Sequence, residues 1–175
     1  KLSKADLDVK GITPVYSSES TNNGIIGYTK TQPEFLVNLE NPVYLIFGDH
    51  TRSFNIATDS FCVADNVKVL RLNKNISIKS ILYIISSWKK GIPEKWYARH
   101  WGFAQETLFS LPTKNWKIDF EFMEEFISEL EQAKLRELEA YLQTTGLQDY
   151  ALTSEEEKVL RDFENGKVEW KEFTI

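Results

Sequence analysis

The sequence holds little of what metal centres, disulfide-rich folds and membrane spans require. Cys62 is the single cysteine among 175 residues, which excludes a disulfide framework within the chain and a cysteine-rich zinc site. The two histidines, His50 and His100, leave few ligands for a metal cage. No apolar run approaches the roughly 18 residues that span a bilayer, and no signal-peptide pattern opens the chain. We therefore expect a protein of the reducing cytoplasm that has no membrane partner.

Common enzyme motifs are also missing. The sequence contains no Gly-x-Ser-x-Gly elbow, no phosphate-binding glycine loop and no Asn-Pro-Pro-aromatic motif. Cys62 stands in an apolar, strand-like context, which favours a buried inert thiol over a nucleophile. Asp49 and His50 are neighbours that point in different directions, and an acid–base pair there is the basis of one alternative, a small hydrolase. We predict that the chain by itself is not an enzyme and binds no cofactor.

The charge is divided unevenly along the chain. Residues 1–118 carry 15 Lys and Arg against 10 Asp and Glu, a net +5, whereas residues 119–175 carry 6 against 16, a net −10. A basic front part joined to an acidic back part favours an anionic partner for the front part alone. Two solvated surfaces without such a partner would explain the same division.

The front part reads as a set of short strands. With 42% hydrophobic and 13% aromatic residues, the chain can bury a core. The expected strands are ITPVYSS, GIIGYT, NPVYLIFG, SFNIAT and NVKVLRL, separated by Asn, Gly, Pro and Asp. A short helix at residues 3–10, a turn at Asn23-Gly24 and a short strand at Thr107–Leu111 are also expected. The pattern predicts an α+β fold with a twisted, mainly antiparallel sheet and short helices.

Three longer helices are predicted. Residues 77–90 place apolar side chains at helical spacing and end in Lys89-Lys90-Gly91, which matches a helix C-terminus. Asp119 to Gln143 predicts a helix of roughly 37 Å. A further helix over 154–164 has Ser154 and Glu157 in capping-box spacing, and residues 167–175 alternate like a terminal strand.

The long helix carries an apolar stripe that we expect to be an assembly surface. Its members are Phe122, Met123, Phe126, Ile127, Leu130, Leu138 and Tyr141. One small domain would not cover such a stripe along its whole length, so a partner subunit or a second copy is expected there. The alternative is that the 154–164 helix folds back onto it, although that helix is too short to shield more than half.

Several polar and basic side chains are candidates for contact with nucleic acid. They are Tyr16, Ser17, Ser18, Asn22, Asn23, Lys30, His50, Thr51, Arg52, Ser53, Lys89, Lys90, Lys95, Arg99 and His100. Hydroxyl, amide and guanidinium groups read base edges, and Lys mostly neutralises phosphate. Arg52, Asn22 and Asn23 are therefore expected to read bases. Ordinary loop polarity explains the same residues equally well, and Arg52 could instead form a salt bridge at the edge of the core.

The order of four segments resembles one protein family. These are GITPVYSSESTNNGIIGYT, GDHTRSFNIATDSFCVADNVKVL, ISIKSILYIISSW and LPTKNWKIDFEFMEEFISELEQAKLRELEAYL. They resemble the DNA specificity subunits of type I restriction–modification systems and the related type IIB specificity subunits over about residues 11–143. LPT…IDFEFMEEFI is the most specific part of the likeness.

The resemblance implies a target recognition domain over 1–116 and a coiled-coil-like conserved helical arm over 117–166. Residues 167–175 would start or complete a recognition domain. The implied role is to read one half of a split target in double-stranded DNA and to dock the DNA adenine methyltransferase and restriction subunits. Those subunits would hold S-adenosylmethionine, ATP and Mg²⁺, and a fragment with one helix could form a homodimer through it. The alternative from another class is a protein-interaction adaptor that does not bind DNA.

Overall fold

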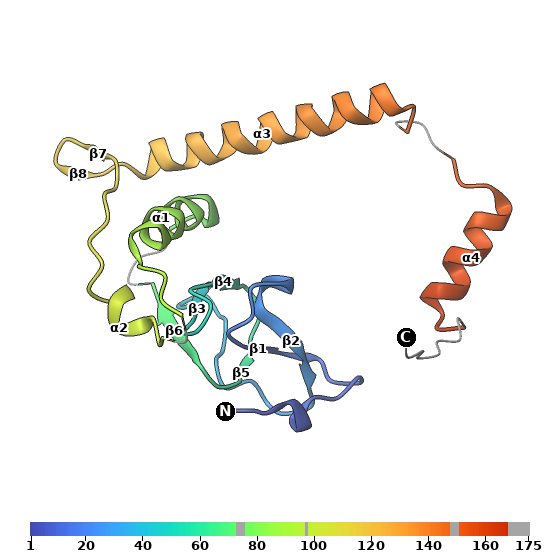
Figure 1. Ribbon diagram of the computed structural model, residues 1–175, viewed down its shortest axis with the longest axis horizontal. Helices are drawn as coiled ribbons and strands as arrows, with labels where there is room; N and C mark the ends of the chain where they lie inside the picture. Colours follow the sequence, from blue (N-terminus) through green and yellow to red (C-terminus); the bar gives the residue numbers. More distant parts are fainter. Residues whose placement is uncertain (73–75, 97, 148–150, 168–175) are drawn as a thin grey trace. The chain divides into compact units, whose positions relative to one another are not determined.

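Figure 1 shows the computed structural model of the chain, which describes residues 1–72, 76–96, 98–147 and 151–167. The chain divides into two compact units, Lys1–Glu129 and Leu130–Ile175. The first unit, called the head from here on, contains every described strand and the first part of the long helix. The proposed boundaries at 116/117 and 166/167 stay predictions.

The described residues contain most of the predicted strands and helices in the predicted order, together with several short elements that were not predicted. The strands are β1 (Thr13–Tyr16), β2 (Ile25–Thr29), β3 (Tyr44–Gly48), β4 (Phe54–Ala57), β5 (Cys62–Val63), β6 (Val67–Arg71), β7 (Thr113–Lys114) and β8 (Lys117–Ile118). The helices are η1 (Lys4–Asp6), η2 (Asn22–Gly24), α1 (Ile78–Gly91), α2 (Trp101–Ala104), α3 (Phe120–Thr145) and α4 (Ser154–Glu164). The mixture of helices and small antiparallel sheets confirms the α+β class.

The strands form small sheets instead of one continuous sheet. One has the order β2-β1-β5, a second the order β4-β3-β6, and β7 and β8 form a hairpin. Among these strand pairs, β1 with β5 is parallel and the others are antiparallel. The mainly antiparallel pairing is as expected, but it is distributed over separate sheets.

Strand β3 is central because both of its faces are buried. Side chains alternate along a strand, so Tyr44 and Ile46 face one way and Phe47 faces the other. Tyr44 and Ile46 belong to the cluster that also contains Tyr16 of β1. Phe47 packs with Ile92 and with residues of α1 and α2. The head is therefore layered: the β2-β1-β5 sheet, then the β4-β3-β6 sheet, then helices α1 and α2.

Local sequence signals set the ends of the helices. The Ser77 hydroxyl accepts the Ser80 N–H at 3.2 Å and begins α1, whose last turn holds two lysines, favourable at the negative end of the helix dipole. The Asp119 carboxylate accepts the Phe122 N–H at 3.0 Å and begins α3. Gly146 takes φ +71° directly after the last residue of α3, the left-handed conformation that glycine adopts at low cost.

Two predicted details of the elements are wrong. Thr107–Leu111 is not a strand: the Thr107 N–H donates to the Ala104 carbonyl at 3.3 Å, at the end of α2, and Phe109 stacks on Trp88. The capping box of α4 uses Thr153 with Glu156, one residue before the predicted pair, and Thr153 lies outside the helix where a cap must lie. The predicted terminal strand falls at 168–175, outside the described residues.

Candidate nucleic-acid interface

The turn between β3 and β4 is the centre of the candidate site. The Gly48 N–H donates to the Ser53 carbonyl at 2.9 Å and the Arg52 N–H donates to the Gly48 carbonyl at 2.9 Å, which closes a tight turn. Arg52 takes φ +55° to complete it. His50 and Thr51 are exposed at its tip. The imidazole of His50 and the hydroxyl of Thr51 are thus exposed on a turn that backbone hydrogen bonds hold in place.

Three hydroxyl groups join this turn to the loop between β1 and β2. Ser18 Oγ accepts the His50 N–H at 3.1 Å and lies 3.4 Å from Thr51 Oγ1, which is 2.8 Å from Ser53 Oγ. All three oxygens approach Gly48, where a Cβ would lie 2.6 Å from Thr51 Oγ1 and 2.9 Å from Ser18 Oγ. Residue 48 must therefore be glycine for the two loops to meet.

An open concavity of about 460 Å³ lies beside these hydroxyls. Its lining residues are Leu2, Ser3, Lys4, Ser17, Ser18, Glu19, Ile26, His50, Thr51, Ala64, Asp65 and Asn66. Four predicted contact residues, Ser17, Ser18, His50 and Thr51, therefore share one hollow. No sequence pattern pointed to Ser3, Lys4 and Asn66, because only the fold brings the N-terminal segment and the β5–β6 turn to this place.

The other flank of the turn is held by the segments 92–94 and 100–101. Arg52 Nη1 donates to the Ile92 carbonyl at 2.8 Å, and Nη2 pairs with Glu94 at 2.7 Å. The Asp49 carbonyl accepts the His100 N–H at 2.9 Å, and Asp49 Oδ1 accepts the Trp101 N–H at 2.7 Å. Because Asp49 is 2% exposed, these are contacts of the interior. The β3–β4 turn is thereby hydrogen-bonded to Ser18 on one side and to Ile92, His100 and Trp101 on the other.

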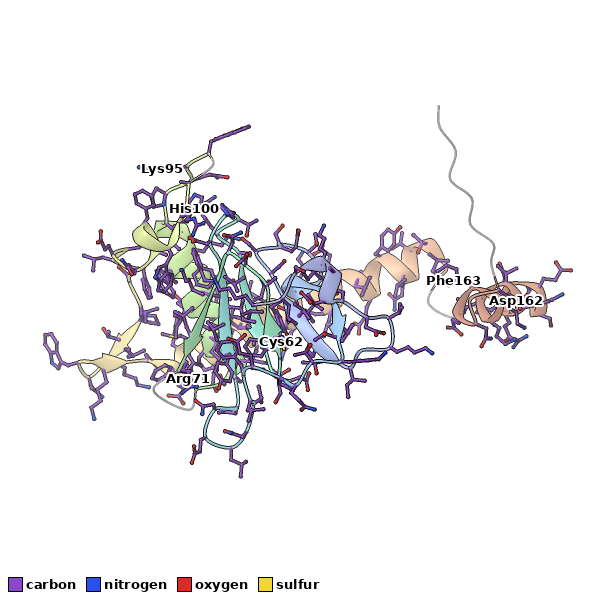
Figure 2. The ribbon with its side chains drawn as sticks, turned by 90° about the horizontal axis from the view of Figure 1, so that it is seen from below. Cys62, Arg71, Lys95, His100, Asp162 and Phe163 are labelled. Carbon is purple, nitrogen blue, oxygen red and sulfur yellow. The ribbon has the colours of Figure 1, made fainter. Side chains whose placement is uncertain are left out.

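Four exposed basic side chains lie on or next to this flank. Lys89 and Lys90 lie in the last turn of α1, and Lys95 and Arg99 follow in the chain between Ile92 and Trp101. Lys95 Nζ lies 4.3 Å from the centroid of the Phe103 ring. Figure 2 shows Lys95 on a loop at one end of the head, next to His100, and Arg71 at the other end. We call the β1–β2 loop (17–21), the β3–β4 turn (49–52) and the segments 89–96 and 98–100 together the recognition edge.

Three predicted contact residues are buried, which corrects their expected role at the surface. Tyr16, Ser53 and His100 are 3%, 4% and 3% exposed. Burial raises the pKa of the Tyr16 hydroxyl, since water no longer stabilises its charged form. Tyr16 belongs to the core cluster between the two sheets, and Ser53 is bonded within the hydroxyl group described above. These three side chains therefore lie in the interior beneath the recognition edge and not at its surface.

The predicted base readers have protein partners in this structure. Arg52 is bonded to Ile92 and Glu94, with its side chain 17% exposed, so the salt bridge at the edge of the core, given above as its alternative role, is present. Asn23 Nδ2 donates to the Ile56 carbonyl at 2.7 Å and its Oδ1 accepts the Ile56 N–H at 3.1 Å. Asn22 Nδ2 donates to the Ile25 carbonyl at 3.0 Å. Their contact with DNA stays a prediction, while their observed bonds hold loops in place.

Lys30 is the remaining candidate, and it lies in an ion pair. Its Nζ is 2.6 Å from Asp8 Oδ2. The Lys30 ammonium, with the Lys10 N–H, holds the pKa of the Asp8 carboxyl below its ordinary value. The pair reduces the charge that Lys30 can offer to a phosphate.

The apolar stripe of α3 divides into two halves. Met123 is fully buried, whereas Phe122 and Phe126 stay 45% and 41% exposed although they meet the Tyr83 ring of α1 edge to face, with ring centroids 6.3 and 5.5 Å apart. The expectation that Met123 lies on a subunit interface is therefore wrong, because its side chain is already fully buried within the head. In the other half, Leu130 and Leu138 are 49% and 52% exposed. Tyr141 in that half is also exposed.

No group of three or more His, Cys, Asp or Glu side chains in the described part of the chain could hold a metal ion. None of the described helices is long and apolar enough to cross a membrane. Cys62 is buried, and its Sγ donates to the Gln32 carbonyl at 3.4 Å.

Comparison with known families agrees with this picture. Residues 1–140 match the family model described as the type I restriction modification DNA specificity domain. Neither the curated proteins nor the solved structures contain a match to the chain. The match covers the whole head and continues into α3. The chain therefore belongs to the family of type I restriction–modification DNA specificity domains.

Proposed function

We propose that the chain reads one half of a split DNA target through its recognition edge and presents that site to methyltransferase and restriction subunits. The observation that carries the proposal is the bonding of the β3–β4 turn to both neighbouring loops, through Ser18 on one side and Ile92 and His100 on the other. Base reading needs side chains held at fixed positions, and this turn is fixed on two sides.

The exposed groups of the recognition edge are of two chemical kinds, hydrogen-bonding groups and cations. His50, Thr51 and Ser17 lie around the concavity and offer hydrogen-bonding groups to base edges in a groove. Lys89, Lys90, Lys95 and Arg99 offer charge to phosphates, which sets the register of the head on the duplex. Arg52 and Asn23 act in this proposal by positioning the turn and the loop.

Catalysis belongs to the partners in this proposal, so the chain itself is non-catalytic. S-adenosylmethionine, ATP and Mg²⁺ are held by the methyltransferase and restriction subunits. The exposed second half of α3 docks a methyltransferase subunit or the same helix of a second copy. At roughly 1.5 Å per residue, a 26-residue helix is about 39 Å long, close to one turn of duplex DNA at ~34–36 Å. It is therefore long enough to separate two recognition heads.

The test is duplex binding as a function of salt, with the methyltransferase subunit present and absent. If four to six phosphates are neutralised, the logarithm of the binding constant falls against the logarithm of salt with a slope of roughly −4 to −5. Lys89→Ala should weaken binding to all duplexes equally and flatten the slope by about one unit. Lys158→Ala, which removes an exposed lysine of α4, is the matched control and should leave the slope unchanged.

Variants of the turn tip separate base reading from phosphate contact. Thr51→Ala should cost ~1–3 kcal/mol on the cognate duplex and relax the sequence preference. Equal losses on cognate and scrambled duplexes would remove Thr51 from the reading role. Absence of salt-dependent binding, even with the methyltransferase present, would favour the protein-interaction adaptor instead.

A further inference from the structure

Asn66 lies in the turn between β5 and β6, where the backbone takes a left-handed conformation with φ +64°. Its carbonyl accepts the Asp49 N–H at 2.8 Å, so the β5–β6 turn is bonded directly to the β3–β4 turn. Asparagine adopts this conformation more readily than most residues, and glycine adopts it at the least cost. The backbone of the turn therefore does not need an asparagine side chain.

The side-chain amide of Asn66 has no partner within the protein. It forms no hydrogen bond with any described residue, although the residue is half-buried. It lines the same concavity of about 460 Å³ as His50 and Ser17. Asn22 and Asn23, which were expected to read bases, use their amides in bonds to the backbone. Asn66 therefore keeps available the donor and the acceptor that those two residues use internally.

The N-terminal segment adds a cation to the same concavity. A backbone bond of 2.9 Å joins this segment to the end of β5, and Figure 1 shows the N-terminus beside that strand. Lys4 of this segment is exposed, and its ammonium group forms no ion pair with a described residue. The acids that line the concavity are Glu19 and Asp65, and Asp65 is paired with Lys1 at 3.5 Å. Lys4 is therefore available to an anionic ligand.

We propose that Asn66 is a specificity-determining residue that reads an adenine of the DNA target, and that Lys4 binds a phosphate near it. The proposal rests on the proposed function and extends the recognition edge to the β5–β6 turn and the N-terminal segment. The amide of asparagine matches the adjacent donor N6 and acceptor N7 of adenine in the major groove. The bond between the two turns holds Asn66 at a fixed place beside the turn that carries His50 and Thr51.

The experiment selects bound sequences from a pool of random-sequence duplexes, with the full chain and the methyltransferase subunit present. Asn66→Gly keeps the left-handed backbone and the carbonyl that Asp49 needs, and it removes only the amide. It should lose the preference for adenine at one position and bind the wild-type target roughly ten- to a hundredfold more weakly. The preferences at the other positions should remain.

Asn66→Asp changes the chemistry of the side chain with little change of shape. A carboxylate has no donor for adenine N7 but accepts from the N4 amino group of cytosine. This variant should therefore prefer cytosine at the position where the wild type prefers adenine. A changed preference, unlike a general loss of affinity, does not follow from partial unfolding.

Two matched controls come from the same head. Asn115 is also an exposed asparagine with a left-handed backbone, at φ +52°, but it lies in the β7–β8 turn, and Asn115→Gly should leave the selected sequence unchanged. Lys4→Ala should weaken binding to all duplexes equally and flatten the salt dependence by about one unit. Lys10→Ala removes an exposed lysine that does not line the concavity, and it should leave the slope unchanged.

The failure of this proposal differs from the failure of the proposed function. If the wild type selects a sequence and both Asn66 variants select the same one, Asn66 reads no base, while the proposed function stands. The same change of preference in Asn115→Gly also overturns the assignment, and equal slopes for Lys4→Ala and the wild type remove Lys4 from the contact. If the wild type selects no sequence, the proposed function and this proposal fail together.

Discussion

Asn23 shows how one side chain can hold a loop in place through bonds to the backbone of a distant strand. Its amide forms both hydrogen bonds that a neighbouring strand would form with Ile56, and its backbone takes φ +48°. Asparagine tolerates this left-handed conformation better than most residues. The following Gly24 packs so closely on Asn55 that no side chain fits there. The β1–β2 loop is therefore fastened to the edge of β4.

Two substitutions at this position separate the backbone from the side chain. Asn23→Gly keeps the left-handed conformation and loses both hydrogen bonds, so it should destabilise the fold by about 1–3 kcal/mol. Asn23→Ala should cost about 1 kcal/mol more, because alanine is also strained at φ above zero. Urea unfolding measures both values. Thr21→Ala is the control, since the Thr21 side chain makes no capping bond. Equal values for Gly and Ala would show that the backbone conformation carries no cost here.

Arg52 and His100 mark the limit of what the sequence could show about the site. The spacing of polar residues located the turn tip, where His50 and Thr51 are exposed as expected. It could not reveal that Arg52 bonds to a carbonyl 40 positions later, or that His100 is buried against Asp49. Whether a polar side chain faces solvent or another loop depends on contacts between distant segments, and these follow from the whole fold.

Elements whose signals are local were predicted well. Strands β1 to β4 and β6 and helices α1, α3 and α4 occur where periodicity and caps indicated them. The parallel pairing of β1 with β5 and the separation into small sheets were not foreseen, since register between distant strands has no signature in either strand alone. The same holds for Thr107–Leu111, which has a strand-like composition but packs through Phe109.

The apolar stripe of α3 contains the buried Met123 near its start and the half-exposed Leu138 near its end. Replacing each side chain by alanine should show which part of the stripe stabilises the fold. Met123→Ala removes a fully buried side chain and should destabilise the head by about 2–5 kcal/mol. Leu138→Ala removes a half-exposed side chain and should change the stability of the isolated chain by less than about 0.5 kcal/mol. Thermal unfolding of the two variants gives the comparison. A large loss at Leu138 would mean that the isolated chain already covers the second half of the stripe.

At the scale of the whole molecule, the charge division fits a chain with two kinds of partner. The front part, with its net +5, contains the recognition edge, and the back part, with −10, contains α3 and α4. An acidic surface repels phosphate, so the back part is suited to a protein partner. Its exposed leucines supply the apolar area such a contact needs, at about 1.5–3 kcal/mol for each side chain fully buried.

This reasoning predicts that assembly and folding depend on different halves of α3. Leu130→Asp combined with Leu138→Asp should abolish association with the methyltransferase subunit, or convert a homodimer to monomer, because charges would be buried in the contact. The head should keep its fold, since both residues follow its last residue, Glu129. Light scattering measures the assembly, and near-ultraviolet circular dichroism of the head's tryptophans measures the fold.

The matched control, Glu131→Lys with Glu139→Lys, alters charge on the same stretch and keeps the leucines. If the leucine variant still assembles as the wild type does, the second half of α3 is not the contact surface, and the covering of its apolar residues must come from elsewhere in the chain.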